Sequence, residues 1–405
     1  MLRRADLHIR DGRIAEHTND ADILDATGLI LCPGLIDIHV HLREPGQAYK
    51  ETIASGTRAA AAGGFTALCC MPNTQPINDS PEITHWMQSP RRGAVVNVFP
   101  IAAATVASLG AELTDYSAMH AAGAVAVTDD GKPVLDDDVM RSALTAAKRE
   151  GIPVIQHAED TRQTQHAPMN AGPVALRLGL RGWAADAETS IVERDIALAA
   201  ETGAHLHVAH LSTAGAMAAV RKAKAAGVHV TCEVTPHHFL LTDESIATFR
   251  YDTNFKMNPP LRSEHDREAL IAGIFDGTVD AIATDHAPHA AHEKQQEFDR
   301  APFGITGLET ALGLSLEELH RKRGLPLDRL IALLSTRPAE LMGLKDRGTL
   351  RPGAHADITL FDPHERWTYH ARDSRSMSKN SPFDGYEMQG RVRYTIVAGK
   401  IVFQA

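Results

Sequence analysis

The chain has 405 residues, of which 43% are hydrophobic and 23% are charged, and its formal net charge is −10. This length suits one large domain with a smaller one, and the composition is that of an ordinary globular protein. The negative net charge and the absence of a run of lysine and arginine argue against a nucleic-acid-binding surface. If the substrate is an anion, a few basic side chains at the site would have to bind it.

Neither a targeting signal nor a membrane span is expected. The first residues, MLRRADLHIRDG, are basic but lack the apolar region of a secretory signal, and no run of 18 consecutive apolar residues occurs. The four cysteines form no CxxC pair, and we interpret them as reduced thiols of the core. We therefore expect a cytoplasmic protein without a membrane partner.

Strand-like segments with turn signals, such as ADLHIRDGRI, open the chain over residues 1–33. From residue 34 onward, short apolar runs alternate with alanine-rich helical stretches. Near-continuous apolar runs are typical of parallel strands that are buried on both faces. Eight such runs occur, at 35–41, 65–71, 95–101, 124–130, 152–158, 205–211, 228–234 and 280–286.

Helices are expected between these runs, most clearly over 135–150, 188–203 and 212–227. Eight strands that are each followed by a helix indicate an α/β fold of the (β/α)8 TIM-type barrel class, here over 34–344. Strand-like segments return near the C-terminus. We therefore expect a small β-sandwich domain built from both termini, over residues 1–33 plus 345–405.

The polar stretch 286–304 follows the last predicted strand and is expected to be an active-site loop. At the other end of the barrel sequence, GLIDIHVHLREPG places two histidines where the first strand ends. Because strand side chains alternate, His39 and His41 face the same side, toward the barrel mouth, where they can bind one metal ion. Asp37 lies one step deeper on that side and could orient a histidine ring.

Other predicted strands carry histidine or aspartate at the same end, where barrel active sites lie. The fourth strand ends in Asp129 and Asp130, the fifth in His157, the sixth in His210 and the eighth in Asp285. Imidazoles and carboxylates in this number are what a pair of divalent cations requires. Such a pair lowers the pKa of a shared water, and Asp285 can carry its proton to a leaving nitrogen.

At these residues the sequence resembles the amidohydrolase superfamily, and more narrowly the dihydroorotases whose metals are bridged by an aspartate. The resemblance covers nearly the whole chain. It implies a metal-dependent cyclic amidohydrolase with two zinc ions per chain. The implied enzyme interconverts L-dihydroorotate and N-carbamoyl-L-aspartate in de novo pyrimidine (UMP) biosynthesis. The motifs that carry it are HLREPG, MPNTQP, VTDDG, QHAED, HVAHLST, MNPPLR, ATDHAPH and FGITGLET.

The resemblance also implies a role for each matching residue. Asp285 is the implied proton shuttle, and Asp130 the implied bridge, since its 27-residue spacing to His157 is similar to that of the aspartate class. Its neighbour Asp129 stays an alternative, and Lys132 a weaker one as a carboxylated lysine. The implied ligands of one zinc ion are His39, His41 and Asp285. The implied ligands of the other are His157 and His210.

Substrate contacts follow from the same resemblance. Arg43, Asn73 and His289 are assigned to the substrate carboxylate, because an arginine presents a planar pair of donors. Asn258 is assigned to the ring amide, and the backbone of residues 303–304 to the ring. The implied substrate-binding set is therefore His41, Arg43, Asn73, Asn258, His289, Phe303 and Gly304. The remaining residues near the strand ends are interpreted as structural, namely His207, His237, His238, His286, His292 and Lys294.

Two other functions stay open. An allantoinase or hydantoinase shares the barrel and the ligands but typically has a lysine bridge. A dihydroorotase-like chain can also be a non-catalytic partner of aspartate transcarbamoylase, although all six ligand positions are filled here. We expect a homodimer that acts on a small molecule, and a complex with aspartate transcarbamoylase is compatible with that activity.

Overall fold

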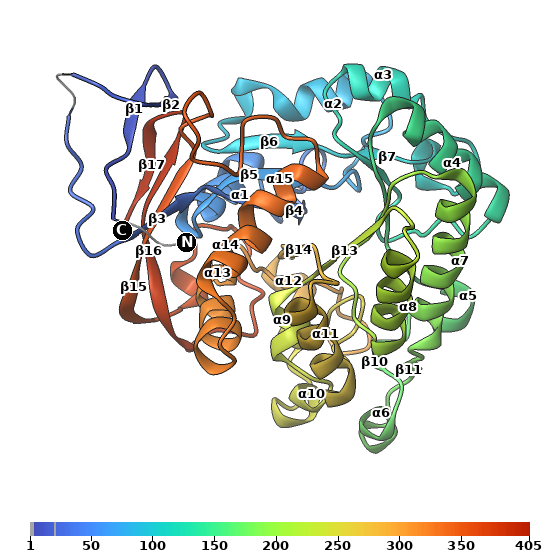
Figure 1. The fold of residues 1–405 in the computed structure, drawn as a ribbon. Helices are drawn as coiled ribbons and strands as arrows, with labels where there is room; N and C mark the ends of the chain where they lie inside the picture. Colours follow the sequence, from blue (N-terminus) through green and yellow to red (C-terminus); the bar gives the residue numbers. More distant parts are fainter. Residues whose placement is uncertain (1–3, 20–21) are drawn as a thin grey trace.

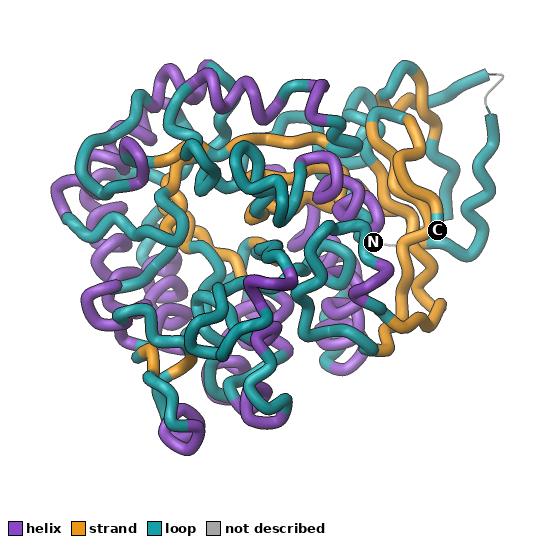
Figure 2. Tube along the Cα trace, turned by 180° about the vertical axis from the view of Figure 1, so that it is seen from behind, coloured by secondary structure: helices purple, strands orange, loops and turns teal. Residues whose placement is uncertain are grey.

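A computed structural model describes residues 4–19 and 22–405 of the chain (Figure 1). Strands form the inside of the larger part of the molecule, and helices surround them. A separate sheet lies at one side, next to both chain ends, as Figure 2 shows from behind. The (β/α)8 class with a small terminal β unit is therefore confirmed, while predicted terminal residues 1–3 and 20–21 lie outside the described residues.

All eight predicted apolar runs contain barrel strands, and neighbouring strands pair in parallel. The ring closes where a parallel bridge joins Val40 to His286, and the His41 amide donates to the His286 carbonyl at 2.9 Å. The strands are β4 (Leu35–Val40), β5 (Phe65–Cys70), β6 (Asn97–Pro100) followed by β7 (Ala102–Ala103), β8 (Val127–Thr128), β9 (Val154–Gln156), β12 (Leu206–Val208), β13 (Val230–Val234) and β14 (Ala281–Ile282).

The three helices that the sequence indicates most clearly are present. The first begins where the Asp136 carboxylate accepts hydrogen bonds from the amides of residues 138 and 139, and ends at the left-handed Gly151. Helices of the barrel are α1 (Ile53–Ala62), α2 (Pro81–Gln88), α3 (Tyr116–Ala121), α4 (Asp137–Glu150), α5 (Thr161–Thr164), α6 (Pro173–Leu178), α7 (Asp186–Thr202), α8 (Ala214–Ala225), α9 (Pro236–Leu240), α10 (Glu244–Thr248), α11 (Glu264–Asp276) and α12 (Ala291–Lys294).

Further helical turns follow the last barrel strand. Two of them are π-helical continuations, and Ala339 and Met342 lie in one buried cluster with Ile36 and Ile38 inside the barrel. These turns are α13 (Ala311–Ser315), η4 (Leu316–Lys322), α14 (Leu327–Ile331), η5 (Ala332–Thr336) and α15 (Arg337–Leu341). Short elements elsewhere are η1 (Pro90–Arg92), η2 (Val106–Ser108), η3 (Thr253–Phe255), η6 (Ala371–Asp373), β10 (Met169–Asn170) and β11 (Gly182–Trp183).

Both ends of the chain form β structure. An antiparallel sheet has the order β17–β16–β15–β3, and a hairpin of β1 and β2 turns at Asp11-Gly12, where both residues have positive φ. The bounds are β1 (His8–Arg10), β2 (Arg13–Ala15), β3 (Ile30–Pro33), β15 (Ile358–Thr368), β16 (Glu387–Val397) and β17 (Lys400–Gln404).

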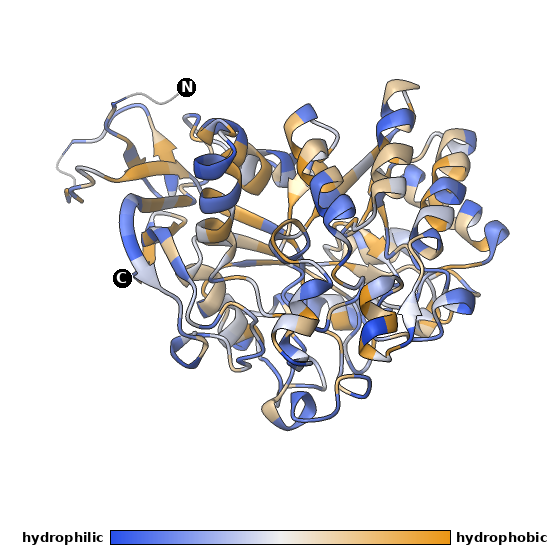
Figure 3. Ribbon diagram, turned by 90° about the horizontal axis from the view of Figure 1, so that it is seen from below, coloured by the Kyte–Doolittle hydropathy of each residue, from blue (hydrophilic) through white to orange (hydrophobic). Residues whose placement is uncertain are grey.

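Hydrophobic residues concentrate on the strands, while much of the hydrophilic surface lies on the outer helices and loops (Figure 3). This distribution is what buried parallel strands predict. Among the described helices, none combines the length and the hydropathy that a membrane crossing needs. The four cysteines are buried and unpaired.

Candidate metal centre and active site

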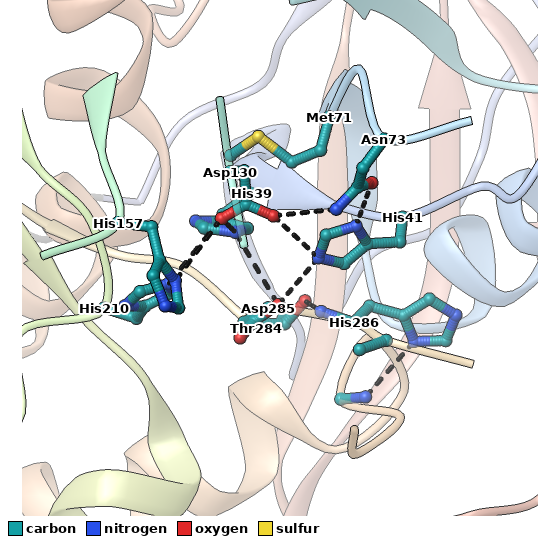
Figure 4. A network of polar contacts seen from close by, with 12 residues as sticks. His39, His41, Met71, Asn73, Asp130, His157, His210, Thr284, Asp285 and His286 are labelled. Carbon is teal, nitrogen blue, oxygen red and sulfur yellow. Dashed lines mark hydrogen bonds and ion pairs between the residues drawn. The ribbon is translucent and has the colours of Figure 1, made fainter. Parts of the chain in front are cut away.

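Six side chains from five strand ends converge at the C-terminal mouth of the barrel (Figure 4). Each of them is buried, with between 0% and 6% of its surface exposed. Three overlapping groups bring their ligand atoms within 4.8 Å of one another. The converging residues are His39, His41, Asp130, His157, His210 and Asp285.

Asp130 lies between the histidines (Figure 4). Its Oδ1 is 3.5 Å from His39 Nε2, 3.7 Å from His157 Nδ1 and 3.8 Å from His210 Nε2. Its Oδ2 is 3.7 Å from His41 Nε2. Oδ1 therefore faces His39 as well as the His157/His210 pair, and Oδ2 faces His41, so one carboxylate adjoins imidazoles of both pairs, as a carboxylate shared by two cations would.

The neighbouring candidates for the bridge point elsewhere. The Asp129 carboxylate accepts hydrogen bonds from the amide and the hydroxyl of Thr105, because successive residues at a strand end face opposite ways. Lys132 is exposed and lies beyond the glycine turn. Only Asp130, of these three residues, lies in the mouth.

Three of the four histidines donate a hydrogen bond from the outer ring nitrogen to a side-chain oxygen. His39 Nδ1 donates to Glu233 at 2.6 Å, His41 Nδ1 to Asn73 at 2.8 Å, and His157 Nε2 to Glu159 at 3.1 Å. Each bond fixes the ring tautomer, so the lone pair of the other nitrogen faces the centre.

Glu233, on β13, was not singled out from the sequence, and it replaces Asp37 as the residue that orients a ring. Asp37 instead accepts hydrogen bonds from the His39 amide and from Thr284. The expectation that Asp37 orients a histidine ring was wrong, because its carboxylate is used by a backbone amide of its own strand and by Thr284 at the end of β14. Burial opposes charge on Glu233, but the nearby His39 and His207 rings lower its pKa to about 2.

These donors fit a divalent cation pair. His157 Nδ1 lies 3.0 Å from His210 Nε2, and His41 Nε2 lies 3.0 Å from Asp285 Oδ1, so atoms of the kind that bind cations are close to one another. His39 Nε2 is buried and has no hydrogen-bond partner among the described residues. Buried carboxylates and imidazoles crowded in this way are suited to bind cations between them.

Asp285 is held as a carboxylate. Burial works against its charge, but the charge of His39 and the hydrogen bond with His41 outweigh burial and lower its pKa well below the usual range. The backbone at Asp285 is left-handed, with φ of 46°, a strained conformation that is common at functional sites. An ionised carboxylate here can accept a proton.

Two of the residues assigned to the substrate carboxylate contact each other beside this cluster. Arg43 Nη2 is 3.4 Å from His289 Nε2, and Arg43 Nε donates to the Pro288 carbonyl at 3.1 Å. Burial and the charge of Arg43 lower the pKa of His289 well below its usual value, so its ring is neutral. The pair forms a cationic corner next to His41.

The other assigned substrate contacts have partners within the protein. Asn73 Nδ2 donates one hydrogen to Asp130 at 3.0 Å, and Asn258 donates to Glu159 at 3.1 Å. Gly304 is buried, its amide donates to the carbonyl of residue 256, and the half-buried Phe303 precedes it. Asn73 therefore lies on the His41 side and Asn258 on the His157 side of the cluster.

Most histidines interpreted as structural lie away from the centre. His286 points away from Asp285 and accepts from the Gly307 amide (Figure 4), and His238 is bonded to Thr235 and to the Pro259 carbonyl. His207 differs, because its Nε2 is 3.4 Å from Glu233 and so supports the residue that orients His39.

Comparisons with known proteins agree with this geometry. A dihydroorotase-like family model matches residues 28–216, and an amidohydrolase family model matches residues 281–403. The chain is 52% identical to the dihydroorotase of Solibacter usitatus over 98% of this chain and 93% of that protein. It is also 52% identical to the dihydroorotase of Citrifermentans bemidjiense, over 94% of this chain and 89% of that protein.

Solved structures support the fold. The dihydropyrimidinase of Brevibacillus agri superposes with a TM-score of 0.83 at 24% identity, over 99% of this chain and 92% of that chain. The L-hydantoinase of Arthrobacter aurescens superposes with a TM-score of 0.86 at 24% identity, over 98% and 91%. With relatives that are half identical over nearly its full length, the chain belongs to the dihydroorotase family of amidohydrolases.

Proposed function

We propose that this chain is a metal-dependent dihydroorotase, which hydrolyses the cyclic amide of L-dihydroorotate to N-carbamoyl-L-aspartate reversibly, in de novo pyrimidine (UMP) biosynthesis. The observation that carries the proposal is the position of Asp130 between the His39/His41 and His157/His210 pairs. Family membership at 52% identity supports this substrate above other cyclic amides.

The proposed cofactor is a pair of zinc ions. His39, His41 and Asp285 would hold one ion, His157 and His210 the other, and Asp130 would bridge them. Bound there, the pair would polarise the ring amide carbonyl and lower the pKa of water.

Asp285 is the proposed general base and general acid. Its ionised carboxylate would take a proton from water and later give it to the ring nitrogen as the amide bond breaks. The His41 Nε2 and His39 Nε2 atoms lie 3.0 Å and 3.6 Å from Asp285 Oδ1, so both rings adjoin the group that would carry the proton. Glu233 and Asn73 keep these two rings in place.

Substrate orientation is the proposed task of the residues around the mouth. Arg43 and His289, with the second Nδ2 hydrogen of Asn73, would bind the substrate carboxylate, since both lie at the cationic corner. Asn258 and the Phe303–Gly304 backbone would contact the ring amide. Together they would hold the scissile bond near Asp285, which is a contribution of proximity.

A side-by-side assay tests the proposal. We expect kcat/KM on L-dihydroorotate to exceed the values on allantoin and hydantoin by orders of magnitude, with about two zinc ions per chain by metal analysis. A preference for hydantoin or allantoin would identify the alternative cyclic amidase. A chain without bound zinc and without turnover would identify a non-catalytic partner.

Other proposals concern the setting of the enzyme. The unpaired, buried cysteines suit a cytoplasmic protein. We also propose a homodimer, a complex with aspartate transcarbamoylase alongside activity, and a division of the chain into a barrel over 34–344 and a terminal β domain over 1–33 plus 345–405. Size measurement of the purified chain, with and without the transcarbamoylase, tests the two assemblies.

A further inference from the structure

A segment near the C-terminus connects the terminal sheet with the barrel mouth. Residues 374–381 follow η6 and lead toward β16. Ser376 donates to the buried carboxylate of Glu51, and Ser378 Oγ donates to the Lys50 carbonyl at 2.6 Å. The segment is therefore attached to the part of the barrel that precedes α1.

Asn380 extends from this segment to the loop after β14. Only 4% of its surface is exposed. Its Oδ1 accepts from the His289 amide at 3.0 Å, and its Nδ2 donates to the carbonyls of Ala287 and Gly304, both at 3.0 Å. Its backbone carbonyl accepts from the Thr306 amide at 2.9 Å. The whole side-chain amide is thus used on one loop.

These bonds join the two ends of that loop. Ala287 and His289 lie at its beginning and Gly304 at its end, and they touch: a Cβ on Gly304 would lie 2.5 Å from the Ala287 carbonyl oxygen and 2.7 Å from the His289 ring. Two carbonyl oxygens face the same region, and the Nδ2 group of Asn380 supplies a hydrogen to each. Without it, two buried acceptors would lose a partner.

The position of the His289 ring depends on this arrangement. Its backbone is held by Asn380, and its ring lies 3.4 Å from Arg43 Nη2 at the cationic corner. Phe303, whose backbone is a proposed ring contact, precedes the Gly304 that Asn380 also binds. One amide from outside the barrel therefore contacts both proposed substrate-binding parts of the loop, and at the Gly304 carbonyl it is joined by Lys294 Nζ at 3.2 Å.

We infer that Asn380 is a positioning residue for substrate binding, which holds His289 and the Phe303–Gly304 backbone in register with Arg43. The identity of the substrate in this inference rests on the proposed function. The part of the inference that concerns the loop structure does not. Asn380 makes no hydrogen bond to any of the six converging residues, so we expect its variants to retain metal.

Two variants test the inference. Asn380→Asp keeps an acceptor for the His289 amide but loses both donated hydrogen bonds, and Asn380→Ala loses all three. In each variant we expect KM for L-dihydroorotate to rise about tenfold or more, while kcat changes less than about threefold. Zinc content should stay equal to that of the wild type. Backbone amides over 287–305 should exchange hydrogen faster by mass spectrometry.

Asn97→Ala is the matched control. Asn97 Nδ2 donates to the Thr66 carbonyl in the barrel at 2.8 Å and to Asp357 in the C-terminal part at 3.3 Å, so it also links these two parts. Asn97 is the first residue of β6, at the end of the strand away from the barrel mouth. The Asn97→Ala substitution should leave KM and the hydrogen-exchange rate of residues 287–305 unchanged. An unchanged KM or an unchanged exchange rate in the Asn380 variants overturns the inference, as does an equal effect in the control. Absence of turnover in the wild type would refute the proposed function instead. Hydrogen exchange over 287–305 would still test whether Asn380 holds the loop.

Discussion

Asp285 combines two tasks that depend on different properties of its carboxyl group. The oxygen of a carboxylate and the oxygen of a side-chain amide can both contact a cation. Of these two groups, only the carboxylate can accept a proton near neutral pH. In Asp285→Asn we therefore expect metal content close to that of the wild type and a fall in kcat of about 10² or more. Metal analysis and steady-state kinetics on L-dihydroorotate measure the two effects separately.

Asp195→Asn is the control for this substitution. Asp195 is also a buried carboxylate, 1% exposed, but it lies on α7 and binds Gln156 and Arg194 outside the mouth. It should retain a kcat near the wild-type value. Rates like those of the wild type in Asp285→Asn would refute the proposed proton transfer.

At the scale of elements, β13 orients a residue of β4. Glu233 holds His39 Nδ1 at 2.6 Å and also accepts from the His210 amide at 3.3 Å, so it touches two proposed ligand segments. Glu233→Gln keeps the size of the side chain but loses its charge. Because partners of metal-binding histidines strengthen binding, we expect zinc affinity to fall about 10- to 100-fold in competition with a chelator.

Glu318→Gln provides the comparison. Glu318 is a buried glutamate of η4, 6% exposed, and it pairs with Arg323 and Lys322 at the outside of the barrel. Its loss should leave zinc affinity within about twofold of the wild type. If Glu233→Gln bound zinc as tightly as this control, Glu233 would have no part in orienting His39.

Elements could be predicted where the signal is local. Apolar runs and helix caps such as Asp136 depend on neighbours in sequence, and all eight strand positions were found from them. The role of Glu233 could not be predicted, because nothing in VHVTCEV tells which strand lies across the barrel. The exclusion of Asp37 depended on its hydrogen bonds with Thr284, a residue 247 positions away in the sequence.

The contacts of Asn380 illustrate a second limit. Its side chain binds the backbone of residues 76 to 93 positions away. Backbone atoms are the same at every residue, so such bonds leave no pattern in the loop sequence. The converging histidines and aspartates were easier to find, because metal chemistry restricts the residue types at each strand end.

For the molecule as a whole, the proposed ligands connect distant parts of the chain. They lie at or just after the ends of β4, β8, β9, β12 and β14, so bound metal would cross-link strands from the first to the last position of the barrel. A ligand that binds only the folded state stabilises it, by about 2.7 kcal/mol at a concentration 100 times its Kd. Removal of metal should therefore lower the melting temperature.

Calorimetry of the wild type after chelation, and again after zinc is restored, measures this effect, and a shift of several degrees in both directions is expected. Asp130→Ala separates metal binding from general stability. Because this variant lacks the carboxylate that faces all four imidazoles, its melting temperature should no longer respond to zinc. A wild-type protein that melts at the same temperature with and without zinc, or an Asp130→Ala protein that zinc still stabilises fully, would show that the converging residues do not hold metal in the proposed way.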